Sequence, residues 1–123
     1  MTLEDIARQL VSNCREGREQ DGLSELYDPG CESVEASDPP GGSRISKGVE
    51  AIKGKHDWWA ANFELHGAEV DGPYLHAPDR FAVIFSMDVT DRSSGQRWKG
   101  REVALYTVAE GKIVREEFFQ APM

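Results

Sequence analysis

The last quarter of the chain, residues 96–120, constrains the fold most because it predicts a long antiparallel hairpin. Two β-rich runs flank a short polar turn, and Gly111 in that turn supplies the positive φ that a tight hairpin loop requires. If Glu110 and Gly111 are the two loop residues, Leu105 lies opposite Glu116. The chain must therefore fold into an architecture that accommodates a long two-stranded ribbon.

Both faces of this predicted hairpin have a mixed character, because side chains alternate between the faces of a strand. One face carries Arg101, Val103, Leu105, Thr107, Val114, Glu116, Phe118 and Gln120. The other carries Trp98, Glu102, Ala104, Tyr106, Ile113, Arg115, Glu117 and Phe119. A plain two-layer sheet has one apolar face and one wet face. The pattern therefore predicts a sheet covered on both sides, by a lined pocket on one and by a partner subunit on the other.

Length and charge limit the classes of function. A chain of 123 residues fits a single domain, spanning 1–123, that buries roughly two thirds of its unfolded surface. The net charge of -8 argues against nucleic acid and anionic membranes as partners, since both require a basic face. The first residues contain no uninterrupted apolar block, so neither a secretory signal nor a transmembrane span is predicted. We expect a cytoplasmic protein.

The cysteines and histidines predict neither a disulfide framework nor a metal site. Cys14 and Cys31 are too few for such a framework, and buried small hydrophobic residues are the expected role. His56, His66 and His76 do not fall at metal-ligand spacing. We expect no metal and no cofactor.

The first half of the chain predicts a helical hairpin. Thr2 and Asp5 resemble a capping box, and apolar residues then recur at helical spacing, so a helix is expected over about 3–16. A short second helix is expected around 23–27, stopped by Asp28-Pro29-Gly30.

A short strand and a third helix are expected next. The strand covers 31–37, and the prolines and glycines of 38–43 form an irregular loop. Ser46 is the expected N-cap of a helix over about 47–63.

Two further strands precede the terminal hairpin. Residues 65–76 contain Gly72-Pro73 and predict a bent or edge strand, whereas 80–91 alternate regularly. A three-residue loop at 93–95 would place Phe85 opposite Val103, and Ile84 opposite Ala104.

This order of elements resembles the SnoaL-like branch of the nuclear transport factor two-like superfamily, which includes ketosteroid isomerase, scytalone dehydratase and limonene epoxide hydrolase. The residues that carry the resemblance are Leu26-Tyr27-Asp28-Pro29 with Val34-Glu35, Lys47-Gly48-Val49-Glu50-Ala51-Ile52, and Glu110 to Phe119. The resemblance implies an α+β, cystatin-like cone with three helices from the N-terminal half packed on the concave face of a curved, mostly antiparallel sheet. It also implies a deep pocket inside the cone and a homodimer on the convex side.

The resemblance does not imply steroid isomerisation. Asp38 is similar in position to the base of ketosteroid isomerase, but Val103 stands where that enzyme keeps its oxyanion-binding aspartate. The first helix also lacks a tyrosine to match the enzyme's other donor. Function must therefore be argued from individual residues.

Three residues are the candidates for catalysis. Glu116 would be desolvated between Val114 and Phe118, which raises the pKa of a carboxyl and suits it to acid–base work. The alternative is a carboxylate paired with a cation or reaching solvent, and a register shift of one residue would turn Glu117 inward instead. His56 could transfer a proton or hydrogen-bond a carbonyl of the ligand; the alternative is a core histidine hydrogen-bonded to a backbone group. Asp38 could act as a base at the pocket mouth; the alternative is an ordinary turn residue before Pro39-Pro40-Gly41.

Further residues are candidates for binding a ligand; they are Tyr27, Trp59, Phe85, Met87, Arg101, Val103, Leu105, Phe118 and Gln120. Trp59, Phe85, Met87 and Phe118 would form an apolar lining for a flat organic ligand, with core packing as the alternative. Tyr27 would offer a hydroxyl or only a packing ring. Arg101 could clamp a carboxylate or enolate, or neutralise Glu116 or Asp38. On the convex side, a homodimer would cover an apolar and aromatic patch. That patch consists of Ile84, Trp98, Ala104, Tyr106, Ile113 and Phe119.

Two functions remain open at this point. One is a small cofactor-independent isomerase, cyclase, dehydratase or hydrolase acting on a compact hydrophobic carbonyl compound. The other is a ligand-binding or dimerisation module of the same fold without chemistry, which the absence of a complete family catalytic set favours.

Overall fold

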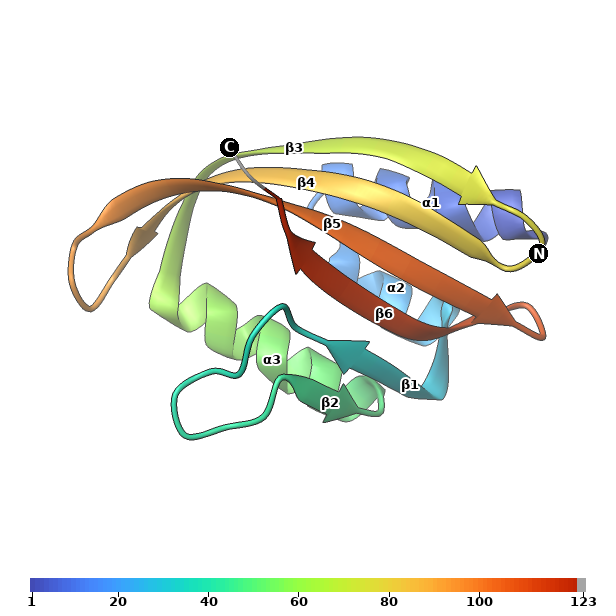
Figure 1. The fold of residues 1–123 in the computed structure, drawn as a ribbon, viewed down its shortest axis with the longest axis horizontal. Helices are drawn as coiled ribbons and strands as arrows, with labels where there is room; N and C mark the ends of the chain where they lie inside the picture. The colour runs from blue at the N-terminus through green and yellow to red at the C-terminus, as the bar shows by residue number, and fades with distance from the viewer. Residues whose placement is uncertain (122–123) are drawn as a thin grey trace.

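A computed structural model describes residues 1–121 and shows three helices against one curved six-stranded sheet (Figure 1). The elements in chain order are α1 (Leu3–Arg15), α2 (Glu19–Glu25), β1 (Tyr27–Val34), β2 (Ile45–Lys47), α3 (Val49–Asn62), β3 (Phe63–His76), β4 (Arg80–Asp91), β5 (Arg97–Ala109) and β6 (Lys112–Gln120). The sheet order is β2-β1-β6-β5-β4-β3. Among the strand pairs of the described residues, β1·β6 alone is parallel. The expected α+β cone with helices on its concave side is confirmed.

Helix α1 begins at the predicted capping box. The Thr2 hydroxyl accepts a hydrogen bond from the Asp5 backbone N–H at 3.1 Å, and the Asp5 carboxylate accepts one from the Thr2 N–H at 3.0 Å. These two bonds satisfy donors that a helix start otherwise leaves unpaired. The helix then buries Ile6 and Leu10 against the sheet.

The other two helices start at different places from those predicted. Helix α2 begins four residues before Leu23 and ends at Glu25, because Tyr27 already pairs with Ile113 of β6. Ser46 lies in β2 and is not an N-cap. Gly48 takes that position with φ 88° and no side-chain cap, a backbone conformation that glycine adopts without strain.

The β5–β6 hairpin forms around the predicted loop but contains a bulge. Glu110 and Gly111 both have positive φ, at 50° and 77°, as a tight hairpin turn requires. Val108 lies opposite Ile113 as predicted, but Thr107 pairs with Arg115. Val114 is thus the extra residue of a β-bulge, and beyond it every residue of β6 lies opposite a different partner from the predicted one.

The β4–β5 connection is also one residue longer than expected. Asp91 and Gln96 close it, so Phe85 lies opposite Glu102, not Val103. A shift of one residue turns every side chain of a strand to the other face. The two shifts cancel between β4 and β6, and Phe85 and Glu116 share the concave face as predicted. Strand β5 is inverted, and so is Ile113 of β6, which lies opposite Val108 before the bulge.

The inversion of β5 corrects part of the predicted convex patch. Ala104, Tyr106 and Ile113 belong to the buried core on the concave side. Trp98 lies opposite buried Val89 and so faces the concave side as well. Of the six predicted residues, Ile84 and Phe119 lie on the convex face.

The core lies between the concave face of the sheet and the helices. Figure 1 shows β3, β4, β5 and β6 arching over α1 and α2, with α3 beside β1 and β2. Buried side chains reach this core from each of these layers; they include Ile6, Leu10, Leu26, Ile52, Phe81, Val83, Tyr106 and Ile113. Within residues 1–121, no helix is long and apolar enough to span a membrane.

Candidate functional site

Glu116 is a carboxyl group enclosed in the core. Its residue surface is 2% exposed, and its Oε2 accepts a hydrogen bond from the Tyr27 hydroxyl at 2.9 Å. Burial raises the pKa of Glu116, while the Lys55 ammonium and the hydroxyls of Tyr27 and Ser33 act in the opposite direction. Oε1 has no hydrogen-bond partner among the described residues. The site therefore holds a desolvated carboxyl with one oxygen still available.

The position of Glu116 follows from strands at the centre of the sheet. Ser33 of β1 and Tyr106 of β5 lie directly opposite it on the two neighbouring strands. Glu117, the next residue, turns outward and pairs with Arg115, its Oε1 accepting a hydrogen bond at 2.7 Å. Glu116 is thus the residue of this pair that faces the interior.

Lys55 connects the interior to the surface. Its Nζ donates a hydrogen bond to the Ser33 hydroxyl at 2.6 Å and lies 2.7 Å from Oε1 of Glu35. The ammonium also lies 5.0 Å from the centre of the Phe118 ring, within the range of a cation–π interaction. One cation on α3 therefore contacts both β1 and β6.

Glu102 is a second carboxyl with altered acidity. It lies on the concave side of β5, opposite Phe85 and Gln120, and is half-buried. Burial raises the pKa of Glu102 to about 7; the charges of Glu35 and Glu116 add to this rise, and that of Lys55 opposes it. A group with such a pKa exchanges protons readily at neutral pH.

The other two predicted catalytic residues lie apart from Glu116. The His56 Nδ1 is 2.9 Å from the Gln20 amide oxygen of α2, and burial lowers the pKa of the imidazole. Asp38 lies in the exposed loop and accepts a hydrogen bond from the Arg44 backbone N–H at 2.9 Å. No hydrogen bond joins either residue to Glu116 within the described chain.

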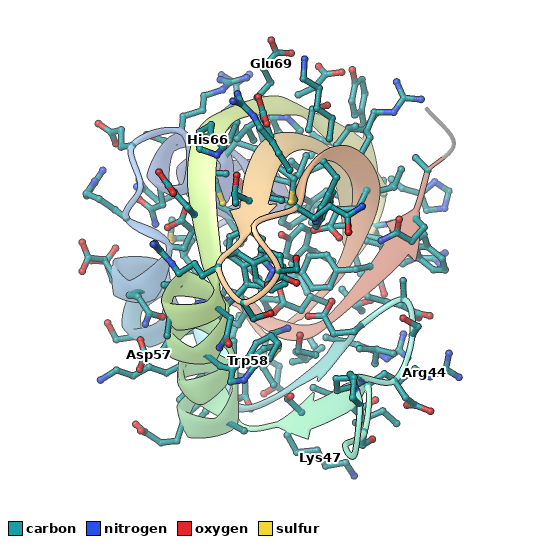
Figure 2. All side chains as sticks on the ribbon, turned by 90° about the vertical axis from the view of Figure 1, so that its left-hand side faces the viewer. Arg44, Lys47, Asp57, Trp58, His66 and Glu69 are labelled. Carbon is teal, nitrogen blue, oxygen red and sulfur yellow. The ribbon has the colours of Figure 1, made fainter. Side chains whose placement is uncertain are left out.

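Aromatic side chains gather at the end of the cone where α3 meets β3. Phe63 stacks on Trp59 with ring centres 5.0 Å apart, and its ring meets Trp98 edge-on at 6.4 Å and Trp58 at 6.1 Å. Figure 2 looks into this end of the molecule and shows Trp58 near the interior edge of the α3 helix. Trp58 and Trp98 remain 53% and 39% exposed.

The remaining predicted binding residues divide between the two faces. Phe85, Met87 and Phe118 lie on the concave side, half-buried. Gln120 lies opposite Glu102 and is exposed.

Three predicted binding residues require a correction. Arg101, Val103 and Leu105 lie on the convex face, because the longer β4–β5 loop inverts β5. Arg101 therefore does not point toward the carboxyls of the interior.

Two open surface hollows lie among the described residues. The larger, about 650 Å³, lies between α1 and β3, with Arg8 and Leu75 in its wall. The smaller, about 250 Å³, lies beside the ends of β1 and β6 and is lined in part by Glu35, Phe118 and Gln120. Neither reaches Glu116, but the smaller one borders the Glu35–Lys55 pair.

Sequence reasoning did not single out Ser33, Lys55, Glu102 or Tyr106 as site residues. Local spacing places Lys55 one helical turn after Ile52 and puts Ser33 on the same strand face as Cys31, but it carries no signal that these two side chains meet. The other two depended on the register of β5. Within residues 1–121, no cluster of three potential ligands could hold a metal ion.

Comparison with known proteins identifies the family. Residues 1–120 match the model of the SnoaL-like domain. A Mesorhizobium loti structure, provisionally described as a SnoaL-like polyketide cyclase and also as a carbohydrate phosphatase, is 37% identical with a TM-score of 0.90, covering 97% of this chain and 99% of that one.

More distant structures share the fold. A protein of the nuclear transport factor two-like group from Burkholderia thailandensis has 18% identity and a TM-score of 0.83, covering 98% of this chain and 92% of that one. TerC, co-crystallised with polyporic acid, has 20% identity and a TM-score of 0.72, covering 97% and 91%. No curated protein matches the chain. On the family match and the 37% identical structure, the chain belongs to the SnoaL-like domain family.

Proposed function

We propose that this protein binds a compact hydrophobic carbonyl compound on the concave side of its sheet and that Glu116 moves a proton on that compound. The reaction class is isomerisation, cyclisation, dehydration or hydrolysis without a cofactor. Tyr27 orients the carboxyl of Glu116, while Phe85, Met87, Phe118 and Trp59 offer apolar surface to the ligand.

One observation carries this proposal: Glu116 is buried, and one of its carboxyl oxygens lacks a hydrogen-bond partner among residues 1–121. A buried polar atom without a hydrogen bond destabilises a fold by about 1–3 kcal/mol, so such an atom is expected where a ligand supplies the missing bond. The raised pKa of Glu116 also suits a group that alternates between acid and base. Glu102 is the second proton-exchanging group. His56 and Asp38, bonded to Gln20 and Arg44, are not part of this proposal.

The test combines ligand binding with product analysis. Aromatic and polyketide-like carbonyl compounds, including polyporic acid, are screened by thermal shift, and those that bind are incubated with protein and analysed by mass spectrometry. In Glu116→Gln, which keeps the shape of the side chain, we expect binding to remain and turnover to fall by about 10²–10⁴-fold. The matched control is Glu117→Gln on the outward face. Equal turnover in wild type and Glu116→Gln would refute the catalytic role.

A binding module without chemistry is the second candidate, and the pocket geometry favours it. The two surface hollows lie outside the core that holds Glu116. Compounds that bind to the wild type without any product would support this candidate over the enzyme.

A homodimer through the convex face belongs to the same proposal. Ile84, Val103 and Phe119 lie directly opposite one another on three adjacent strands, and Phe119 is 46% exposed. An apolar row of this kind is typically covered by a partner. The proposal also includes a cytoplasmic location, supported by the unpaired Cys14 and Cys31, since a reducing compartment keeps thiols free.

A further inference from the structure

Ser33 lies between a buried acid and a cation that reaches the surface. It is directly opposite Glu116 in the parallel β1·β6 pair, and its Oγ accepts a hydrogen bond from Lys55 Nζ at 2.6 Å. Ser33 is 0% exposed. The serine is therefore enclosed in the core, in contact with Lys55 and directly beside the strand residue Glu116.

The chemistry of lysine fixes the direction of the serine proton. An ammonium group has donors and no acceptor, so Lys55 must donate and Ser33 Oγ must accept. The Ser33 hydroxyl proton is then directed away from Lys55. Oε2 of Glu116 already accepts a hydrogen bond from Tyr27, whereas Oε1 has no hydrogen bond to any group of the described chain that meets the usual geometry. The Ser33 hydroxyl acts on the Glu116 carboxyl as a hydrogen-bonding group that lowers its pKa, so its proton is available to Oε1 whenever no ligand bonds to that oxygen.

The outer end of this series is Glu35. Its Oε1 lies 2.7 Å from Lys55 Nζ, and the side chains of Glu35 and Lys55 are 37% and 19% exposed. Glu35 also lines the hollow of about 250 Å³ beside β6. The exposed fraction of the side chains therefore decreases from Glu35, at the hollow, through Lys55 to the buried residues Ser33 and Glu116.

We propose that Glu35, Lys55 and Ser33 form a proton relay that connects the hollow beside β6 with Glu116. An acid in the hollow, hydronium or a protonated ligand, gives its proton to the Glu35 carboxylate. Glu35 passes that proton to Lys55 Nζ as Lys55 releases another of its protons to Ser33 Oγ, and Ser33 releases its original hydroxyl proton to Oε1 of Glu116. One N–H and one O–H bond break and re-form, so one proton enters at Glu35 and one arrives at Glu116.

Other titratable groups face Glu116 and contribute to its equilibrium without forming part of this relay. They are Tyr27 and Cys31 of β1, Cys14 of α1, and Glu102 and Tyr106 of β5. The cysteines and tyrosines hold their protons near neutral pH, because burial raises the pKa values of Cys14 and Cys31 to about 12 and raises those of Tyr27 and Tyr106 well above their usual value. Glu102 is the remaining group that exchanges protons in this range.

The relay deepens the proposed function, on whose acid–base role for Glu116 it rests, but its test needs no substrate. The carbonyl stretch of the protonated Glu116 is followed by infrared spectroscopy after a rapid pH jump, and Glu116→Gln identifies the band. In Ser33→Ala, which removes one oxygen, we expect the protonation rate to fall by about tenfold or more. Lys55→Met is expected to slow it similarly.

The matched control is Lys53→Met, an exposed position on the same helix, which should leave the rate unchanged. Protonation of Glu116 in Ser33→Ala and Lys55→Met at the wild-type rate would overturn the relay. The role of Glu116 would then still be decided by the turnover of Glu116→Gln, so the two failures can be told apart.

Discussion

Replacing Glu102 with glutamine should remove a specific part of the pH dependence of stability. Burial, together with the charges of Glu35 and Glu116, raises the pKa of Glu102 from 4.5 to about 7. Between these two values the folded protein keeps a proton that the unfolded chain has lost. Since stability falls with rising pH wherever the folded state binds more protons, Glu102 destabilises the fold progressively from about pH 4.5 to about pH 7.

The magnitude follows from the size of the shift. One pKa unit corresponds to 1.36 kcal/mol, so the difference between 4.5 and about 7 corresponds to about 3 kcal/mol. The carboxyl is half-buried, and its coupling to Glu116 spreads part of this effect over both groups. In Glu102→Gln we therefore expect a free energy of unfolding close to that of wild type at pH 4.5 and about 3 kcal/mol higher at pH 8.

Urea unfolding measured from pH 4.5 to pH 8 tests this expectation. The matched control is Glu69→Gln on β3, an exposed position that Figure 2 shows at the outer surface. Its stability should follow the wild-type curve within about 0.5 kcal/mol, as is usual for surface substitutions. If the curves of Glu102→Gln and wild type stay parallel over the whole range, the desolvation of Glu102 has been misjudged.

Two further predictions concern the interior and the register of β5. Tyr27→Phe removes the donor to Oε2 of Glu116 and should lower the free energy of unfolding by about 1–3 kcal/mol. Urea unfolding measures this loss, with the exposed Tyr74→Phe as the control. Equal stability of the two variants would contradict the prediction. A cysteine should react quickly with a thiol reagent at pH 8 in Arg101→Cys and slowly in Ala104→Cys, because residue 101 is exposed and residue 104 is buried. Fast labelling at both positions would exclude the observed register of β5. The native thiols of Cys14 and Cys31 react slowly in this assay, because burial raises their pKa to about 12.

The sequence was sufficient for the fold but not for the face of every strand. The alternating residues 80–91 correctly predicted strand β4, and Glu110-Gly111 correctly predicted the loop of the terminal hairpin. The bulge at Val114 and the extra loop residue before β5 leave no signal in the alternation itself, because both are set by how the strands pack. Each moves the register by one residue, which is why Glu116 was placed on the correct face while β5 was inverted.

The sequence predicted the central carboxyl of the candidate site, Glu116, but not the residues that surround it. Glu116 stood out as a carboxyl between apolar residues. Lys55 did not, since a lysine on a helix is usually solvated, and only the three-dimensional proximity of Ser33 and Glu35 gives it a role. Contacts between residues far apart in the chain are not encoded in local spacing, so such a series of groups becomes visible only in the folded structure.

The composition of the interior argues that the site exists for more than stability. Replacing buried ionisable groups with well-packed apolar ones is often neutral or stabilising, and an unpaired atom such as Oε1 of Glu116 destabilises the fold further. A core that served stability alone would carry leucine or methionine at this position. The double variant Tyr27→Phe/Glu116→Met removes both partners of the buried hydrogen bond and should therefore unfold at a higher urea concentration than wild type at pH 8 while losing any turnover. A less stable double variant would show that the pair contributes to the fold itself.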